Sequence, residues 1–355
     1  MGNSSLFFML YIHMKIHSHL AISEKHILIV GNRSYKNLGD ELILLWTVKL
    51  LLAEEKKITI AAYDPEWLKK FFSQFIDVSK ITFVTEIPKG FRTRVKYIRE
   101  GKLKERKIYR KADAVIIGWG EIITEENKNS YRYRLVSILP CLRKPRYLMG
   151  GIQLPKKLFN RFLFTRILKR TKHIFARDHE TVHEMKTYGF DNVEFFMDTS
   201  YFAYDWEKIR NWLVLKGGKL KIENWKKYIV INLNKNAEKF LSETIQDVKK
   251  LYNQWYEVMY VPVAKWNNDY YNDMKYAHKI QRATEIKDQR FTLLDREEDF
   301  DGFIETVAQA HIVISSRLHL FLIASFLGAE TKVYPYQKKI LKMQHTLAES
   351  LHIKT

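Results

Sequence analysis

Short apolar runs alternate with amphipathic stretches along most of this chain, and their spacing predicts a parallel β-sheet. In the first half the runs recur about every 20–35 residues, which leaves room for a crossover helix between consecutive strands. The predicted strands of this half are HILIV (26–30), ITIAA (58–62), ITFV (81–84), DAVII (113–117), RYLMG (146–150), HIFA (173–176) and EFFM (194–197).

The alternation lapses near residue 205 and then resumes, which predicts a second domain. Residues 206–227 contain a Gly-Gly pair and polar clusters without periodicity, so we expect a linker there. We therefore expect an α/β fold in which two Rossmann-like domains, 25–205 and 228–355, face each other across a cleft. The predicted strands of the second domain are YIVINL (228–233), EVMYVPV (257–263), FTLL (291–294), HIVI (311–314) and TKVY (331–334).

The stretch HIVISSRLHLFLIASFLGAE (311–330) carries the most chemical information. Its first apolar residues predict a buried strand broken by Ser315 and Ser316, and the later apolar run, closed by a glycine, predicts a helix. Arg317 and His319 then lie where a parallel strand passes into a helix, the edge at which open α/β sheets bind ligands. A cation beside a titratable imidazole suits an anionic substrate that must also receive a proton.

A polar loop, GNRSYKNLGD (31–40), follows the first predicted strand and precedes a helix expected to begin near Glu41. It lacks both the glycine spacing of dinucleotide-binding turns and the lysine of a phosphate-binding loop, so neither is predicted, and Asp64 after the second strand is a weak candidate for a ribose-binding acid. Asp40 suits a helix N-cap, or alternatively a contact with a sugar hydroxyl that Asn37 would share.

A second loop begins with Arg177 and Asp178, directly after the predicted strand 173–176. Asp178 is expected to cap the next helix. An arginine at the end of a buried strand needs an anionic partner, which favours a ligand over a structural ion pair with a residue such as Asp198.

The chain is strongly basic, with a formal net charge of +20, and contains a single cysteine, Cys141. Lys and Arg are concentrated between residues 89 and 111 and between 143 and 173. A lysine-rich soluble surface explains part of this excess, and the remainder suits a phosphorylated substrate, an acidic lipid surface or nucleic acid. The basic blocks match no DNA- or RNA-binding module, so nucleic acid is the least favoured. One cysteine allows neither an intrachain disulfide nor a thiolate metal site, which is typical of a cytoplasmic protein.

The first 24 residues are expected to be an extension outside the fold, and Met14 is an alternative start. They lack the charge and cleavage features of a signal peptide, and Leu6 stands where a myristoylation motif has Ser or Thr. No apolar run approaches the roughly 20 residues that span a bilayer. The segment RFLFTRILKR (161–170) spreads its cations around the helix, so a packed helix is favoured over a membrane-surface one.

Six segments in the same order resemble those of the polysaccharide pyruvyl transferase family, over roughly residues 26–340. The Arg-Leu-His of residues 317–319 is similar to that family's signature. The other five are NLGDELIL (37–44), which resembles an Asn-x-Gly-Asp segment, ADAVIIGWGEII (112–123), a strand entering a glycine-rich turn, ARDHETVHEM (176–185), FFMDTSYF (195–202) and YPYQKK (334–339).

This resemblance implies an enzyme that transfers a pyruvyl group from phosphoenolpyruvate to a sugar diol of a cell-surface polysaccharide or its lipid-linked precursor. It implies the two-Rossmann (GT-B) architecture and no metal or organic cofactor. Arg317 and Arg177 would bind the donor's anionic groups and His319 would donate a proton. Asp40 or Glu121 would accept the hydroxyl protons. The implied substrate-binding residues are Asn37, Gly39, Asp40, Gly118, Gly120, Glu121, Ser316 and Lys235.

Three positions depart from the family pattern and keep alternatives open. Trp119 stands inside the glycine turn, the Gly150-Gly151 strand end has one glycine fewer, and Lys235 is the cation nearest to a position where arginine is common. The alternatives are a nucleotide-sugar glycosyltransferase of the same architecture and an inactive glycan-binding relative. Peripheral contact with the inner membrane is expected if the acceptor is lipid-linked.

Overall fold

The structure, a computed structural model, describes residues 22–31, 36–87, 95, 97–101, 106–123, 144–152, 155, 161–162, 165, 168–169, 171–196, 227–264, 273–294, 300–335 and 340–341. These residues form two compact units. The first contains the described residues of 22–31 and 47–196, and the second contains those of 36–46 and 227–341. Residues 1–21 of the predicted 1–24 extension, Cys141, and residues 206–226 of the predicted 206–227 linker lie outside the described residues. Residues 22–24 were expected outside the fold, but Ile22 is buried and Glu24 pairs with Lys172, so the first unit includes them.

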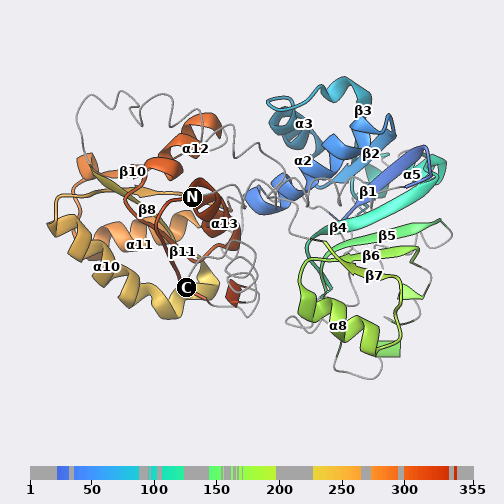
Figure 1. The fold of residues 1–355 in the computed structure, drawn as a ribbon. Helices are drawn as coiled ribbons and strands as arrows, with labels where there is room; N and C mark the ends of the chain where they lie inside the picture. The colour runs from blue at the N-terminus through green and yellow to red at the C-terminus, as the bar shows by residue number, and fades with distance from the viewer. Residues whose placement is uncertain are drawn as a thin grey trace, which may run out of the picture. The chain divides into compact units, whose positions relative to one another are not determined.

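The first unit contains a seven-stranded parallel sheet in the order β3-β2-β1-β4-β5-β6-β7, drawn from blue to green in Figure 1. The order reverses between β1 and β4, as in Rossmann-like folds. The strands are β1 (His26–Val30), β2 (Lys57–Ala62), β3 (Ile81–Thr85), β4 (Ala114–Ile123), β5 (Arg146–Ile152), β6 (His173–Ala176) and β7 (Val193–Phe195).

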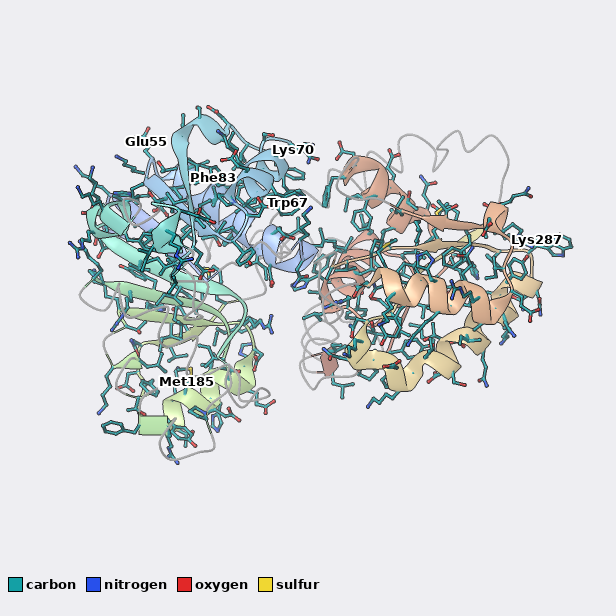
Figure 2. All side chains as sticks on the ribbon, turned by 180° about the vertical axis from the view of Figure 1, so that it is seen from behind. Glu55, Trp67, Lys70, Phe83, Met185 and Lys287 are labelled. Atoms are coloured by element: carbon teal, nitrogen blue, oxygen red, sulfur yellow. The ribbon has the colours of Figure 1, made fainter. Side chains whose placement is uncertain are left out.

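Helices of the first unit cover the sheet because apolar residues of both elements form one core. Met185 of α8 is fully buried in this core (Figure 2), together with residues of β1, β4, β5 and β6. Figure 1 shows α3 beside the β2–β3 edge and α8 beside the β6–β7 edge. The helical elements are α2 (Leu38–Ala53), whose first residues group with the second unit, α3 (Pro65–Phe72), η1 (Val78–Lys80), α5 (Arg106–Lys111) and α8 (His179–Thr187).

The second unit contains a five-stranded parallel sheet in the order β10-β9-β8-β11-β12. Helices α10 and α11 pack together, as do α12 and α13 (Figure 1). The strands are β8 (Tyr228–Asn232), β9 (Glu257–Tyr260), β10 (Phe291–Leu293), β11 (Val313–Ser315) and β12 (Thr331–Val333). The helical elements are η5 (Lys235–Phe240), α10 (Leu241–Asn253), α11 (Met274–Thr284), η6 (Asp288–Arg290), α12 (Phe300–Gln309) and α13 (Leu318–Leu327).

At two places a strand continues through residues that were predicted to end it. Strand β11 runs through Ser315 because its register with β8 and β12 continues to that residue, so the first serine does not break the strand. Strand β4 continues to Ile123 with register shifts after Gly118, where a turn was predicted. The remaining predicted strands recur within a few residues, and no helix of the described residues is long and apolar enough to span a membrane.

Candidate functional site

The turn between β11 and α13 holds Arg317 at the carboxyl edge of the second sheet. The Ser315 hydroxyl lies 3.0 Å from both the backbone N–H and the carbonyl oxygen of Arg317, so it accepts from the first and donates to the second. Helix α13 follows at once because nine of its ten residues are apolar or buried, and Gly328 ends it in the left-handed conformation at φ 80°. The predicted helix, with its closing glycine, is confirmed.

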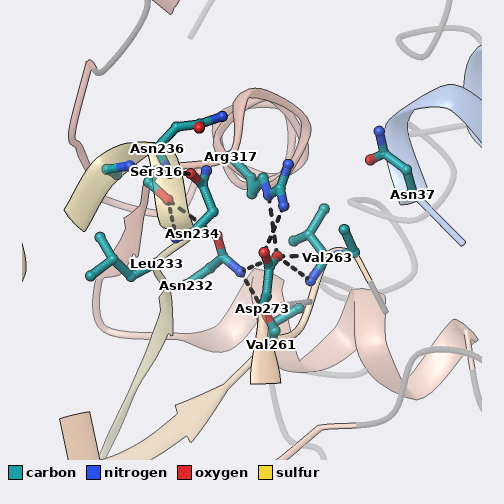
Figure 3. Close-up of polar contacts among 12 residues, drawn as sticks. Asn37, Asn232, Leu233, Asn234, Asn236, Val261, Val263, Asp273, Ser316 and Arg317 are labelled. Carbon is teal, nitrogen blue, oxygen red and sulfur yellow. Dashed lines mark hydrogen bonds and ion pairs between the residues drawn. The ribbon is translucent and has the colours of Figure 1, made fainter. Parts of the chain in front are cut away.

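Arg317 pairs with Asp273, which is buried with only 1% of its surface exposed. Its Nη2 lies 2.6 Å from Oδ1 and its Nε lies 3.2 Å from Oδ2, so the pair is bidentate (Figure 3). The Arg317 side chain keeps 14% of its surface exposed. A buried carboxylate and a partly exposed guanidinium together make a cation of fixed orientation.

Asparagines at the end of β8 surround this ion pair. The Asn232 amide donates to Asp273 Oδ2 at 3.0 Å, and Asn234 donates its backbone N–H to the Ser316 hydroxyl at 3.0 Å. Ser316 is fully buried, so its hydroxyl ties the β8 and β11 turns together. Burial, followed by the Asp273 charge, raises the pKa of Tyr260 well above its ordinary value. The oxygen of the neutral phenol lies 2.7 Å from the Leu233 carbonyl oxygen and 2.8 Å from the Asp273 carbonyl oxygen, and either one can accept its single proton.

The Asn-x-Gly-Asp segment lies in the same unit, at the start of α2. Leu38 donates its backbone N–H to the Val263 carbonyl at 3.2 Å, and Asn37 pairs with Ala264 in an isolated bridge. The helix begins at Leu38, so the expectation that Asp40 is its N-cap is wrong. Asp40 lies in the first turn and accepts from the Asn37 amide at 2.9 Å.

A second acid of that turn closes the start of α2. The side chain of Glu41, which is fully buried, accepts the Asn37 backbone N–H at 3.0 Å. A carboxylate that reaches back to the residue before a helix satisfies one of the N–H groups that the helix leaves open, as in a capping box. The helix therefore begins before Glu41 because Glu41 itself stabilises the earlier turn.

His319, in the first turn of α13, packs directly against Gly39. A β-carbon on Gly39 would lie 1.7 Å from His319 Nδ1, so only glycine allows the imidazole to occupy this place. His319 is 9% exposed. The structure thus brings together the predicted residues Asn37, Gly39, Asp40, Arg317 and His319, all in the second unit.

Other predicted residues belong to the first unit. Arg177 is buried, with 7% exposed, and its guanidinium lies over Gly151, where a β-carbon would come within 2.7 Å of Nη2. Gly118 allows the middle of β4 to approach the middle of β5, since a β-carbon there would lie 2.9 Å from the Met149 carbonyl oxygen. Asp178 caps α8 as expected, accepting the Thr181 N–H at 2.8 Å.

The remaining predicted positions have these places. Gly120 and Glu121 lie in β4, but the surroundings of their side chains and of the Trp119 side chain are outside the described part of the structure. Asp198 and residues 336–339 also lie outside it. Lys235 is an exposed residue at the start of η5. Asp64 caps α3 through the Trp67 N–H at 3.1 Å. Tyr334 stacks on Phe240 and donates to Asp247, so it fastens β12 to α10.

Sequence reasoning missed Asp273, Asn232 and Asn234. The two asparagines had a usable signal, because polar residues at the end of the buried strand YIVIN are expected at the ligand-binding edge. Asp273 had none, since its sequence neighbourhood gives no reason to place it beside Arg317. No group of three or more His, Cys, Asp or Glu side chains arranged for a metal ion occurs among the residues the structure describes.

Comparison with known families gives one match over most of the chain. The model of the polysaccharide pyruvyl transferase family matches residues 37–331. That range contains every segment of the second unit that forms the site above, from the Asn-x-Gly-Asp turn to α13. No curated protein matches the chain.

Solved structures share the fold at low sequence identity. The Staphylococcus aureus MnaA–UDP structure is similar with a TM-score of 0.54 and 15% identity, covering 92% of this chain and 88% of that one. Methanocaldococcus jannaschii UDP-GlcNAc 2-epimerase, in complex with UDP-GlcNAc and UDP, gives 0.53 and 12%, covering 93% of each chain. A Rickettsia africae glycosyltransferase gives 0.51 and 12%, covering 93% and 89%. These likenesses confirm a fold of two Rossmann-like domains of the GT-B type.

Proposed function

Because the chain belongs to the polysaccharide pyruvyl transferase family, we propose that it transfers the enolpyruvyl group of phosphoenolpyruvate to a sugar diol, forming a cyclic ketal. The acceptor class is a cell-surface polysaccharide or its lipid-linked precursor. The observation that carries the proposal is the geometry of one turn. Arg317 is oriented by a buried carboxylate, and His319 lies two residues further on, packed on the Asn-x-Gly-Asp segment.

Arg317 is the proposed ligand of an anionic group of the donor. Phosphoenolpyruvate carries a phosphate and a carboxylate, and a planar guanidinium binds either oxyanion through paired hydrogen bonds. The first turn of α13 adds backbone N–H groups, which favour negative charge at a helix start. That Arg177 is the second cation that binds the donor remains a prediction from the family resemblance.

His319 is the proposed acid. Protonation of the methylene carbon of the enol makes the neighbouring carbon an oxocarbenium-like centre, which one sugar hydroxyl attacks. Loss of phosphate and attack by the second hydroxyl close the ketal, so phosphoenolpyruvate and the diol yield the ketal and inorganic phosphate. A bound phosphate dianion favours the protonated imidazole, which couples donor binding to the proton that the first step needs.

Asp40 is the described candidate for the base that accepts the hydroxyl protons. It is partly exposed in the first turn of α2, and Asn37 orients its carboxylate. Glu121 remains the alternative base. The proposed chemistry uses side chains and the donor alone, with no cofactor, and we expect it in the cytoplasm, with peripheral membrane contact when the acceptor is lipid-linked.

Calorimetric titration of the purified protein with phosphoenolpyruvate, beside UDP- and GDP-sugars, tests this proposal. We expect saturable phosphoenolpyruvate binding that weakens about tenfold or more in Arg317→Lys, which keeps the charge but loses the bidentate fork. Arg282→Ala is the matched control, because it removes an exposed arginine of α11 in the same unit. Its binding should be unchanged.

Phosphate release tests the role of His319 separately. With a panel of alkyl glycosides whose neighbouring hydroxyl pairs are free, His319→Gln should bind phosphoenolpyruvate but release phosphate about a hundredfold more slowly, the contribution of one positioned acid. Unchanged release in both Arg317→Lys and His319→Gln would refute the assignment. Tight binding of a nucleotide sugar without binding of phosphoenolpyruvate would favour the glycosyltransferase alternative.

A further inference from the structure

We propose that Asp273 is a positioning residue, which holds the Arg317 guanidinium in the orientation that binds the donor anion. This inference rests on the function proposed above. Its basis is the number of donors that converge on one buried carboxylate. Besides the two bonds from Arg317, Oδ2 accepts from the Asn232 amide at 3.0 Å and from the backbone N–H groups of Val263 and Ala264, each at 3.1 Å (Figure 3).

Five donors leave the carboxylate no freedom to follow a moving arginine. Three of them come from Asn232 and the backbone, so Asp273 stays in place whether or not Arg317 pairs with it. The pairing then fixes the plane of the guanidinium through its Nε and Nη2. Since the Arg317 side chain keeps 14% of its surface exposed, an anion can still reach the oriented group.

The same carboxylate also orders the backbone on which the start of α2 rests. The backbone N–H groups of Val263 and Ala264 donate to Asp273. The Val263 carbonyl in turn accepts the Leu38 N–H, and Ala264 forms a β-bridge with Asn37. Asp273 therefore aligns the cation with the turn that carries Asp40.

The sign of the expected effect separates positioning from simple electrostatics. A carboxylate beside an anion site repels the ligand, so charge alone predicts that Asp273→Asn tightens phosphoenolpyruvate binding. Positioning predicts the opposite, because an amide cannot accept both arginine donors and also the backbone and Asn232 donors. Weaker binding in the more positive site is the outcome that we expect.

A double-mutant cycle with Arg317→Lys provides the test. In the presence of Arg317, Asp273→Asn should weaken phosphoenolpyruvate binding and raise KM about tenfold, whereas in the Arg317→Lys background the same change should cost less than about twofold. Asp247→Asn is the control, since Asp247 pairs with Lys332 and Tyr334 in the same unit and should leave binding unchanged. If Asp273→Asn folds poorly, Asn232→Ser takes its place. This variant removes one donor from the Asp273 carboxylate and should weaken phosphoenolpyruvate binding by a smaller factor.

Three results would overturn the inference. Equal losses of binding in both arginine backgrounds would mean that Asp273 supports only the fold, and tighter binding would mean that it acts only as a charge.

If the unaltered protein does not bind phosphoenolpyruvate, the proposed function fails, and NMR of the Arg317 Nε–H resonance decides the inference alone. We expect this resonance, assigned by its loss in Arg317→Lys, to be protected from solvent exchange and to lose protection in Asp273→Asn but not in Asp247→Asn. Unchanged protection in Asp273→Asn would refute positioning.

Discussion

His319 depends on a glycine, because its imidazole fills the space that a side chain at position 39 would occupy. The sequence placed both residues among the candidates, through the Arg-Leu-His and Asn-x-Gly-Asp resemblances, but not beside each other. Residues 39 and 319 are 280 positions apart in the chain. No local sequence pattern can therefore indicate that they are in contact. The residue types were predictable, and the pairing was not.

Gly39→Ala tests this contact. Its β-carbon would lie 1.7 Å from His319 Nδ1, so the imidazole or the start of α2 must move. We expect a loss of stability of about 1–3 kcal/mol, the usual cost of overpacking, together with loss of phosphate release. Urea unfolding and the release assay measure the two effects. Combining Gly39→Ala with His319→Ala should recover most of the stability, and a purely additive double variant would show that the two residues do not compete for space.

Helix ends show which local features the sequence specifies at the scale of single elements. Helix α13 begins and ends as predicted because Gly328 adopts the left-handed conformation after a continuous apolar run. Helix α11 ends instead at Glu285, which holds the same conformation at φ 57° although it carries a β-carbon. The predicted start of α2 was placed too late. The Glu41 side chain accepts the Asn37 backbone N–H and so stabilises an earlier turn, which the preference for Asp at the N-cap does not reveal.

Glu285→Gly should therefore stabilise the protein. The left-handed conformation costs a residue with a β-carbon roughly 1–2 kcal/mol, and the greater freedom of unfolded glycine offsets roughly 0.5–1 kcal/mol of that. We expect a net gain of about 0.5–1 kcal/mol, measured by the urea midpoint. Gly328→Ala is the matched control of opposite sign, because it introduces a β-carbon at φ 80°. A lower midpoint in Glu285→Gly would contradict this account.

At the scale of the whole molecule, charge and architecture follow from different features of the chain. Both sheets are parallel, as the spacing of apolar runs predicted, because each crossover helix must bury its apolar face on the sheet. The net charge of +20 plays no part in that fold. Exposed cations such as Lys70 and Lys287 project from the two units (Figure 2) and contribute to a positive field that attracts anionic substrates.

Salt should accordingly weaken the use of phosphoenolpyruvate. Raising KCl from about 50 to about 300 mM shortens the screening length from above 10 Å to below 8 Å, and we expect KM for the donor to rise several-fold with little change in kcat. Initial rates at a fixed acceptor concentration measure this, with sucrose of equal osmolality as the control. A KM that does not respond to salt would show that the basic excess serves another purpose, such as solubility.

The two Rossmann-like domains, the parallel sheets and the apolar helix after Arg317 could all be predicted from the amino-acid sequence, since periodicity and helix-ending residues act over short stretches. The sequence also identified Arg317, His319 and the Asn-x-Gly-Asp segment as candidates. Only the tertiary structure placed that segment in the second unit and brought Asp273 to Arg317. The physical reason is that a buried charge must find its partner and its hydrogen-bond donors in space. For Asp273 those come from the end of β8, the segment that follows β9 and the turn before α13, which no local pattern links.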